Sequence, residues 1–110
     1  MELSVFERLL LRNIIPEIQG WNYANMKDAR ELLEGLFTEE EETDLQFEQE
    51  DKQVKWKVVK EDDTPIPQER EIPVSGGLRK KIGKFLKQLD QDEMLGFEHY
   101  TLVEKMGLGE

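Results

Sequence analysis

The side chains of this sequence that could take part in chemistry are charged and sorted into blocks. Eight acids and no base lie between residues 39 and 51, and four lysines and no acid lie between residues 52 and 60. Five bases and no acid then lie between residues 79 and 87. Blocks of one sign form surfaces that a charged partner can bind. The sequence therefore offers candidate interaction surfaces of both signs.

The acidic block is the first candidate surface. The residues that we expect to form it are Glu39, Glu40, Glu42, Asp44, Glu48, Glu50 and Asp51. Such a segment can imitate nucleic acid or attract a basic protein over a long range. Solubility and helix capping explain the same charges, because Thr38 and Glu41 have the spacing of a capping box and first-turn acids suit the helix dipole. Trp21 and Tyr23 are candidate anchors for a protein partner, or else they fill the core between the first two helices.

The lysines of the second block have the spacing of one helix face. Lys80, Lys84 and Lys87 fall at i, i+4 and i+7, and Lys81 lies at the margin of this face. A lysine face can contact the phosphates of a nucleic acid. The apolar stripe of the same helix, which includes Phe85, lies on the opposite face, so no aromatic side chain is expected among these lysines to stack on bases. The alternative is a solvated face whose lysines pair with acids elsewhere in the fold.

Enzymatic chemistry finds no support in the sequence. The chain has no cysteine, which excludes disulfides, thiolate metal sites and cysteine nucleophiles. His99 is the only histidine, so neither a zinc site nor a serine nucleophile with a histidine base is expected. Ser4 and Ser75 suit helix N-caps instead. The acidic block lacks the ligand alternation and central glycine of an EF-hand loop. We expect no enzyme activity, no cofactor and no metal ion.

The composition predicts one small domain over residues 1–110. A chain of 110 residues with 36% charged residues and a net charge of −10 suits a polar surface around a modest core. No signal peptide is visible at the start, and no apolar run approaches the roughly 20 residues that a membrane span needs. We therefore expect a cytoplasmic protein that does not bind membranes.

Hydrophobic periodicity predicts an α+β fold. The expected elements are two N-terminal helices over 4–15 and 26–37, a short acidic helix over 39–43, a central β-hairpin with strands over 45–48 and 54–58, and two C-terminal helices over 76–89 and 97–106. Ile72 and Val74 are candidates for a third strand, which Pro73 restricts to a sheet edge. Residues 61–71 read as a mobile loop. The first helix is apolar on most sides, so it is either the central core element or the seam of a homo-oligomer.

Helix caps and the inward face of the hairpin follow from local spacing. Ser4 with Glu7, Asn25 and Ser75 are the expected N-caps of the first, second and fourth helices. The hairpin is expected to turn through residues 50–52. The side chains expected to face the core from its strands are Leu45, Phe47, Val54, Trp56 and Val58.

Six stretches of the chain carry a family resemblance. They are NIIP at 13–16, GWNY at 20–23, LFTEEE at 36–41, LQFEQE at 45–50 leading to VKW at 54–56, FLKQLD at 85–90 and EHYTLVEK at 98–105. Together they resemble small acidic proteins encoded by tailed bacteriophages and prophages, and the resemblance spans most of the chain. It implies a viral context, in the cytoplasm of a host cell, where small acidic proteins often bind host or viral proteins. The family has no established activity, so the resemblance assigns no functional residue.

The sequence thus predicts a small phage or prophage accessory protein that acts by protein–protein interaction. Its acidic surface would bind a basic partner, and a host factor is the candidate target. One alternative is a nucleic-acid-binding protein that uses the lysine face of helix 76–89. The other is a structural phage protein that forms oligomers through helix 4–15.

Overall fold

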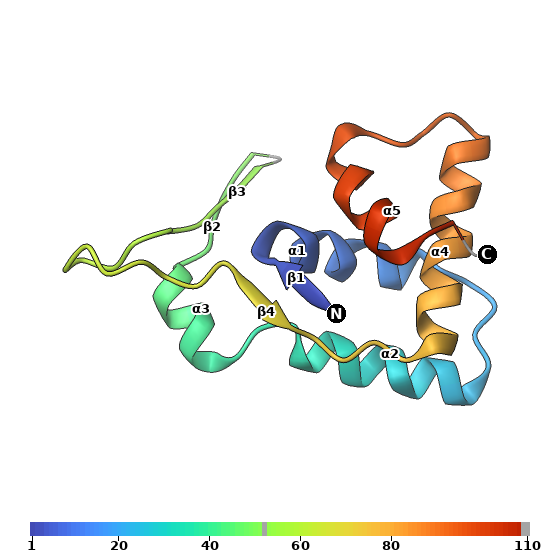
Figure 1. Ribbon diagram of the computed structural model, residues 1–110, viewed down its shortest axis with the longest axis horizontal. Helices are drawn as coiled ribbons and strands as arrows, with labels where there is room; N and C mark the ends of the chain where they lie inside the picture. Colours follow the sequence, from blue (N-terminus) through green and yellow to red (C-terminus); the bar gives the residue numbers. More distant parts are fainter. Residues whose placement is uncertain (52, 109–110) are drawn as a thin grey trace.

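The computed structural model describes residues 1–51 and 53–108, and it confirms the predicted α+β class (Figure 1). The elements in chain order are β1 (Glu2–Ser4), α1 (Val5–Ile14), the 3-10 turn η1 (Ile15–Glu17), α2 (Tyr23–Gly35), α3 (Glu39–Leu45), β2 (Glu48–Glu50), β3 (Gln53–Lys55), β4 (Glu69–Glu71), α4 (Gly76–Gln91), the 3-10 turn η2 (Phe97–His99) and α5 (Tyr100–Met106). The strands form two antiparallel pairs, β1 with β4 and β2 with β3.

Helix α1 lies at the centre of the molecule (Figure 1). Ser4 caps it with the predicted capping box: the Ser4 hydroxyl accepts from the Glu7 amide at 3.1 Å, and the Glu7 carboxylate accepts from the Ser4 amide at 2.9 Å. The apolar side chains of α1 pack inside the chain, and only Phe6 among the large ones is exposed, at 44%. The helix therefore acts as the core element, and an oligomer seam along it would have Phe6 as its main apolar contact.

The apolar residues gather into two clusters that share α1. The larger core joins α1, α2, α4 and α5, and its buried residues are Leu3, Leu11, Ile14, Ile15, Ile18, Ala29, Leu32, Leu36, Ile72, Leu78, Ile82, Leu86, Leu102 and Met106. The smaller core consists of Val5, Leu9, Leu45 and Ile66. The rings of Phe37, Phe47 and Trp56 cover the smaller core edge to face. The buried side chains of Leu78, Ile82 and Leu86 form the apolar stripe of α4.

The third strand lies elsewhere than predicted. Instead of Ile72 and Val74 extending the hairpin, β4 spans residues 69–71 and pairs with β1, with Leu3 opposite Arg70. Ile72 follows the strand and is buried in the larger core. The three residues of β1 carry no period-two signal of their own before the helix begins, so the sequence does not reveal this pairing. Part of the segment expected as a mobile loop, 61–71, is thus regular structure.

The hairpin is shorter than predicted, because its first strand begins later and its second strand begins and ends earlier. Strands β2 and β3 pair Glu48 with Lys55, and Leu45 is not in a strand but closes α3, because its side chain fills the smaller core from the helix. Gln46 ends α3 in the left-handed conformation, with φ of 46°. Val58 is 57% exposed, so the prediction that it faces the core is wrong. Lys52, in the predicted turn, lies outside the described residues.

Two helix starts also differ from the prediction. Helix α2 begins at Tyr23, because Asn22 rather than Asn25 is the N-cap: the Asn22 side chain accepts from the Asn25 amide at 2.7 Å. The last helix begins at Tyr100, after η2. The Thr38 and Ser75 caps agree with the prediction. Within the described residues, none of the helices combines the length and the apolar character that crossing a membrane requires.

Candidate interaction surfaces

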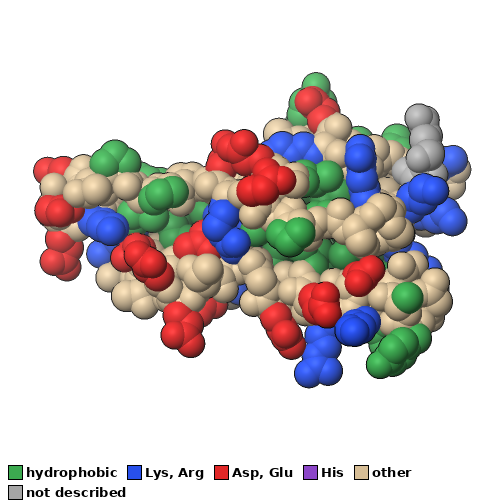
Figure 2. Space-filling view, turned by 60° about the horizontal axis from the view of Figure 1, so that its bottom comes forward, with side chains coloured by type: hydrophobic (Ala, Val, Ile, Leu, Met, Phe, Trp, Pro, Cys, Tyr) green, Lys and Arg blue, Asp and Glu red, His purple; other side chains and the backbone are tan. Residues whose placement is uncertain are grey.

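Most of the net charge of the protein lies at one end. We call residues 38–64 the acidic end; they comprise α3, both hairpin strands and the loop that follows them. This segment contains eleven acids and four bases, and so accounts for seven of the ten net negative charges of the chain. It forms the left part of the molecule in Figure 1, and Figure 2 shows acidic side chains projecting there with basic ones among them.

The predicted surface acids divide into free and paired groups. Glu39, Glu40 and Glu42 are exposed on α3, and none forms an ion pair with a described lysine or arginine. Glu48 and Asp51 are also exposed. By contrast, the Asp44 carboxylate lies 3.7 Å from the Lys60 ammonium, and the Glu50 carboxylate lies 2.9 Å from the Lys55 ammonium. The outer face of α3 is therefore the part of the block with the most unpaired charge.

Glu41 points inward, to a buried arginine. Arg8 is 0% exposed, and its guanidinium donates to the Glu41 carboxylate at 2.6 Å and to the carbonyl oxygens of Leu36 at 3.0 Å and Gln68 at 3.3 Å. Arg70 Nε lies 2.9 Å from the same carboxylate. Burial alone would raise the pKa of Glu41, but the two arginines and the Thr38 amide outweigh it and lower that pKa. This cluster, which the sequence analysis missed, fixes α3 to α1. Its only sequence signal is an arginine in a helix that is apolar on most sides.

A second buried carboxylate fixes α1 to α5. Glu7 is 2% exposed, and its carboxylate accepts from the Lys105 ammonium at 2.6 Å. Burial works against its ionisation, yet the Lys105 contact and the Ser4 backbone amide lower the pKa of Glu7 below its ordinary value of 4.5. Helix α1 thus contributes the buried member, Arg8 or Glu7, to each of two ion pairs.

These two carboxylates predict a loss of stability in acid. A lowered pKa in the folded state stabilises the protein above the unfolded pKa of about 4.5, and this contribution is lost as pH falls through the folded values. We expect the double variant Glu7→Gln/Glu41→Gln to lose less stability than the wild type between about pH 4.5 and pH 2.5. Urea denaturation at a series of pH values measures this. Glu39→Gln/Glu42→Gln, which removes two exposed unpaired acids, is the control and should follow the wild type; equal slopes in all three proteins would contradict the prediction.

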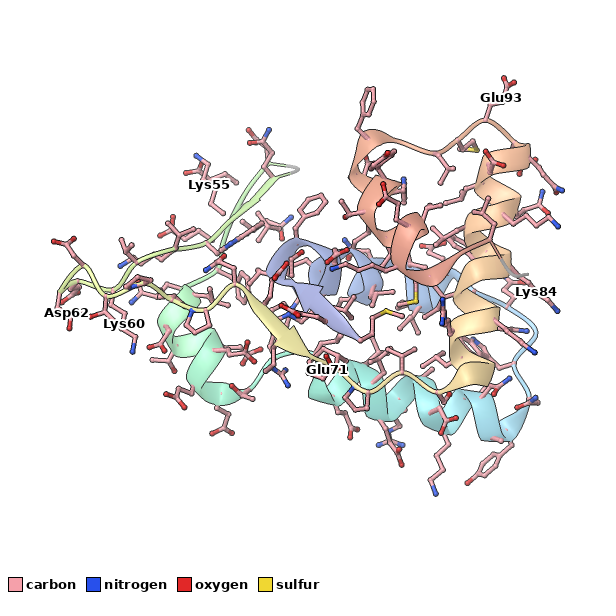
Figure 3. All side chains as sticks on the ribbon, viewed as in Figure 1. Lys55, Lys60, Asp62, Glu71, Lys84 and Glu93 are labelled. Carbon is pink, nitrogen blue, oxygen red and sulfur yellow. The ribbon has the colours of Figure 1, made fainter. Side chains whose placement is uncertain are left out.

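The lysine face lies at the other end of the molecule. Lys80, Lys84 and Lys87 are exposed on α4, and no carboxylate among the described residues lies within 4 Å of their ammonium groups. Figure 3 shows Lys84 pointing outward at the opposite side from Lys60 and Asp62. Lys81 at the margin is half-buried and donates to the Gly20 carbonyl oxygen at 2.5 Å. The ion pairs of the acidic block are formed with lysines and arginines outside α4, so the acidic and the basic surface do not neutralise each other.

The two aromatic anchor candidates have different surroundings. The Trp21 ring is half-buried against the larger core, and its Nε1 donates to the Ile18 carbonyl oxygen at 2.9 Å. Tyr23 is 84% exposed, so it does not fill the core. Neither lies at the acidic end, since both come from the segment beside α4 (Figure 1). The idea that they anchor the partner of the acidic block has no support from this placement.

A further exposed aromatic surface, which the sequence does not reveal, is formed by Phe97 and Tyr100. Phe97 and Tyr100 fall within the helix predicted over 97–106, but they are 99% and 65% exposed. They lie on η2 and at the start of α5, where the 3-10 turn rotates them away from the core. His99 in the same turn is structural, because its Nδ1 accepts from the Gly96 amide at 2.9 Å. Among the described residues no three acidic or histidine side chains gather as metal ligands would.

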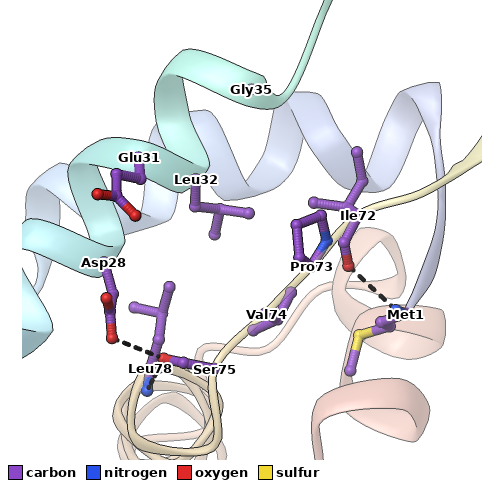
Figure 4. A pocket seen from close by; sticks show the side chains of 10 residues that line it. All are labelled: Met1, Asp28, Glu31, Leu32, Gly35, Ile72, Pro73, Val74, Ser75 and Leu78. Carbon is purple, nitrogen blue, oxygen red and sulfur yellow. Dashed lines mark hydrogen bonds between the residues drawn. The ribbon is translucent and has the colours of Figure 1, made fainter.

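A groove of about 520 Å³ runs between α2 and the chain that leads from β4 into α4 (Figure 4). Its floor is apolar, with Leu32, Ile72 and Leu78, and Asp28 and Glu31 lie along its α2 side. Asp28 accepts from the Ser75 hydroxyl at 3.0 Å, so this carboxylate supports the start of α4. The groove contains no arrangement of nucleophile, base and oxyanion donor.

The described residues therefore offer two charged surfaces, an exposed aromatic turn and an open groove beside α2. Comparison of the chain with protein-family models, with curated proteins and with solved structures finds no match.

Proposed function

We propose that this protein works by binding a basic partner protein through its acidic end. The observation that carries the proposal is the concentration of seven of the ten net negative charges in residues 38–64, with Glu39, Glu40 and Glu42 exposed and unpaired on α3. A surface with this much charge of one sign raises the rate of encounter with a partner of opposite sign.

Helix α3 holds these charges in a fixed arrangement. Its N-terminus is capped by Thr38, its inward carboxylate Glu41 is bound to Arg8, and Leu45 at its end is fully buried. The outer carboxylates are therefore positioned before a partner arrives, which reduces the entropy lost on binding. Preorganisation distinguishes this surface from a flexible acidic tail.

Exposed ion pairs contribute only about 0.2–1 kcal/mol each, so a specific complex also needs apolar contact. The acidic end supplies some: Val58 is 57% and Val59 is 44% exposed. An isolated β-bridge between Val59 and Pro65 holds the chain at this point. Charge would thus set the rate and orientation of encounter, and the valines would add buried area.

The resemblance to small acidic phage and prophage proteins suggests where such a partner is found. Under this proposal the protein is a viral accessory protein in the host cytoplasm, and its target is a basic host factor. The acidic end would occupy the basic surface of that factor and so change its activity.

Affinity capture from a bacterial extract tests the proposal. The baits are the wild type, the triple variant Glu39→Lys/Glu40→Lys/Glu42→Lys, and a matched triple variant Glu17→Lys/Glu31→Lys/Glu93→Lys, whose three sites are also exposed but lie outside the acidic end. We expect a basic protein that the wild type and the matched variant retain at about 50 mM salt and that the α3 variant loses, with weaker retention at about 200 mM. Identical capture by all three baits, or no capture at either salt, would refute the proposal.

A further inference from the structure

We propose that the lysine face of α4, together with the chain segment beside it, binds single-stranded nucleic acid. This goes beyond the proposed function, because it uses the opposite end of the molecule and a different class of partner. It rests on what the fold brings next to Lys80, Lys84 and Lys87.

The fold brings an aromatic ring from another segment next to the lysine helix. The segment from Ile18 to Asn22 runs alongside α4, at the right of Figure 1. It brings the Trp21 ring to 5.7 Å from the Lys81 ammonium, measured to the ring centroid. Phe85 lies on α4 itself, one residue after Lys84. Both rings are partly exposed, so each has some surface that a base could contact.

A shallow groove lies between α4 and the segment that runs alongside it. It has a volume of about 180 Å³ and is lined by Ile18, Gln19, Lys81, Lys84 and Phe85. The Trp21 ring is fixed beside it by the bond from Nε1 to the Ile18 carbonyl oxygen, and Lys81 fixes the segment to α4 through the Gly20 carbonyl oxygen. The site therefore combines the exposed Lys84, the Gln19 amide and two partly exposed rings, with Lys80 and Lys87 on the same helix face as Lys84. Basic and aromatic side chains together can hold a single strand by its phosphates and its bases.

The rings favour a single strand over a duplex. Bases of a duplex are stacked on one another and do not present a free face to a protein side chain. A single strand can stack on an aromatic ring with little regard to sequence. Three lysines on one helix face would contact only a few phosphates, so the stacking contribution is needed for binding.

The net charge of −10 does not prevent this binding at physiological salt. Helix α4 contains five bases and one acid. The acidic end lies at the other side of a molecule that is 45 Å long (Figure 3). Charges are screened over about 8 Å at physiological ionic strength, so repulsion between the strand and the acidic end is weak there. At low salt this repulsion reaches further, so the proposal predicts a salt dependence flatter than that of an ordinary basic protein.

Fluorescence anisotropy with a labelled oligothymidylate of about 16 nucleotides tests the proposal, with a duplex of equal length as comparison. The variants are Lys80→Gln/Lys84→Gln/Lys87→Gln and a matched triple variant Lys27→Gln/Lys55→Gln/Lys57→Gln, whose lysines are exposed on α2, on β3 and just after β3. We expect the α4 variant to bind at least about tenfold more weakly than the wild type, and the matched variant to bind like the wild type.

The fluorescence of Trp21 provides an independent measurement. In the Trp56→Phe variant Trp21 is the one remaining tryptophan of the chain. Stacking of a base should quench its emission when the single strand is added, and the duplex should not.

Three outcomes would overturn the proposal. The first is no binding of the single strand at about 50 mM salt, and the second is binding that the α4 variant retains. The third is equal binding of duplex and single strand without a change in Trp21 emission. If the strand is not bound but sedimentation shows lysine-dependent self-association, the partner of this face is the acidic end of another copy and the proposal is wrong.

Discussion

Replacing Arg8 with methionine is expected to lower the free energy of unfolding by about 3–5 kcal/mol. Arg8 is fully buried, and its guanidinium satisfies the Glu41 carboxylate and the carbonyl oxygens of Leu36 and Gln68. Methionine fills much of the same volume but donates no hydrogen bond. It therefore leaves a carboxylate with Arg70 as its remaining ion-pair partner, and carbonyl oxygens that lose a buried donor.

Urea denaturation followed by far-UV circular dichroism measures this loss. Arg30→Met is the control, because Arg30 is an exposed arginine whose pair with Glu34 lies on the surface of α2, and it should change stability by less than about 0.5 kcal/mol. The double variant Arg8→Met/Glu41→Leu removes both charges. It should therefore lose less stability than the sum of the losses in Arg8→Met and in Glu41→Leu. If Arg8→Met costs no more than Arg30→Met, the buried cluster does not hold α3 to α1.

Features with a local physical cause could be predicted from the sequence. The capping boxes of Ser4 with Glu7 and Thr38 with Glu41 need only residues three apart, and both are present. The stripe of Leu78, Ile82 and Leu86 needs only the period of a helix, and it is buried. The α+β class followed from these local signals.

Features that depend on distant partners could not be predicted in the same way. Arg8 and Glu41 are 33 residues apart, and β1 meets β4 across more than 60 residues. Leu45 has the pattern of a strand start, yet it is helical because the smaller core needs its side chain at the end of α3. The choice between Asn22 and Asn25 as cap is also open in the sequence, since both residues cap well.

The candidate surfaces also combine features that are visible in the sequence with features that depend on distant parts of the chain. The charge blocks and their signs are visible in the sequence, and so is the helical spacing of Lys80, Lys84 and Lys87. Whether the blocks neutralise each other depends on the fold, which sends Glu41 inward and separates α3 from α4 (Figure 1). Trp21 comes to lie beside Lys81 only because the segment after η1 runs along α4. The exposure of Phe97 follows from a 3-10 turn that helical periodicity does not reveal.

Leu45→Ala is expected to lower the free energy of unfolding by about 2–5 kcal/mol. We expect the acidic end to be destabilised more than the rest of the molecule. Leu45 is 0% exposed and is one of four buried residues that make up the smaller core among the described residues. The larger core contains fourteen such residues and does not include Leu45. Removing the leucine side chain should therefore allow α3 and the hairpin to open while the helices around the larger core stay folded.

Native-state hydrogen exchange distinguishes this local opening from global unfolding. In Leu45→Ala the amides of α3 should exchange much faster than those of α4, whereas Leu86→Ala, a cavity in the larger core, should speed exchange in both helices together. If α3 and α4 lose protection equally in Leu45→Ala, the two clusters unfold as one unit. Because the fixed position of Glu39, Glu40 and Glu42 depends on the smaller core, local opening in Leu45→Ala should also weaken capture of the basic partner without changing any charge. That result would separate the contribution of preorganised geometry from that of net charge alone.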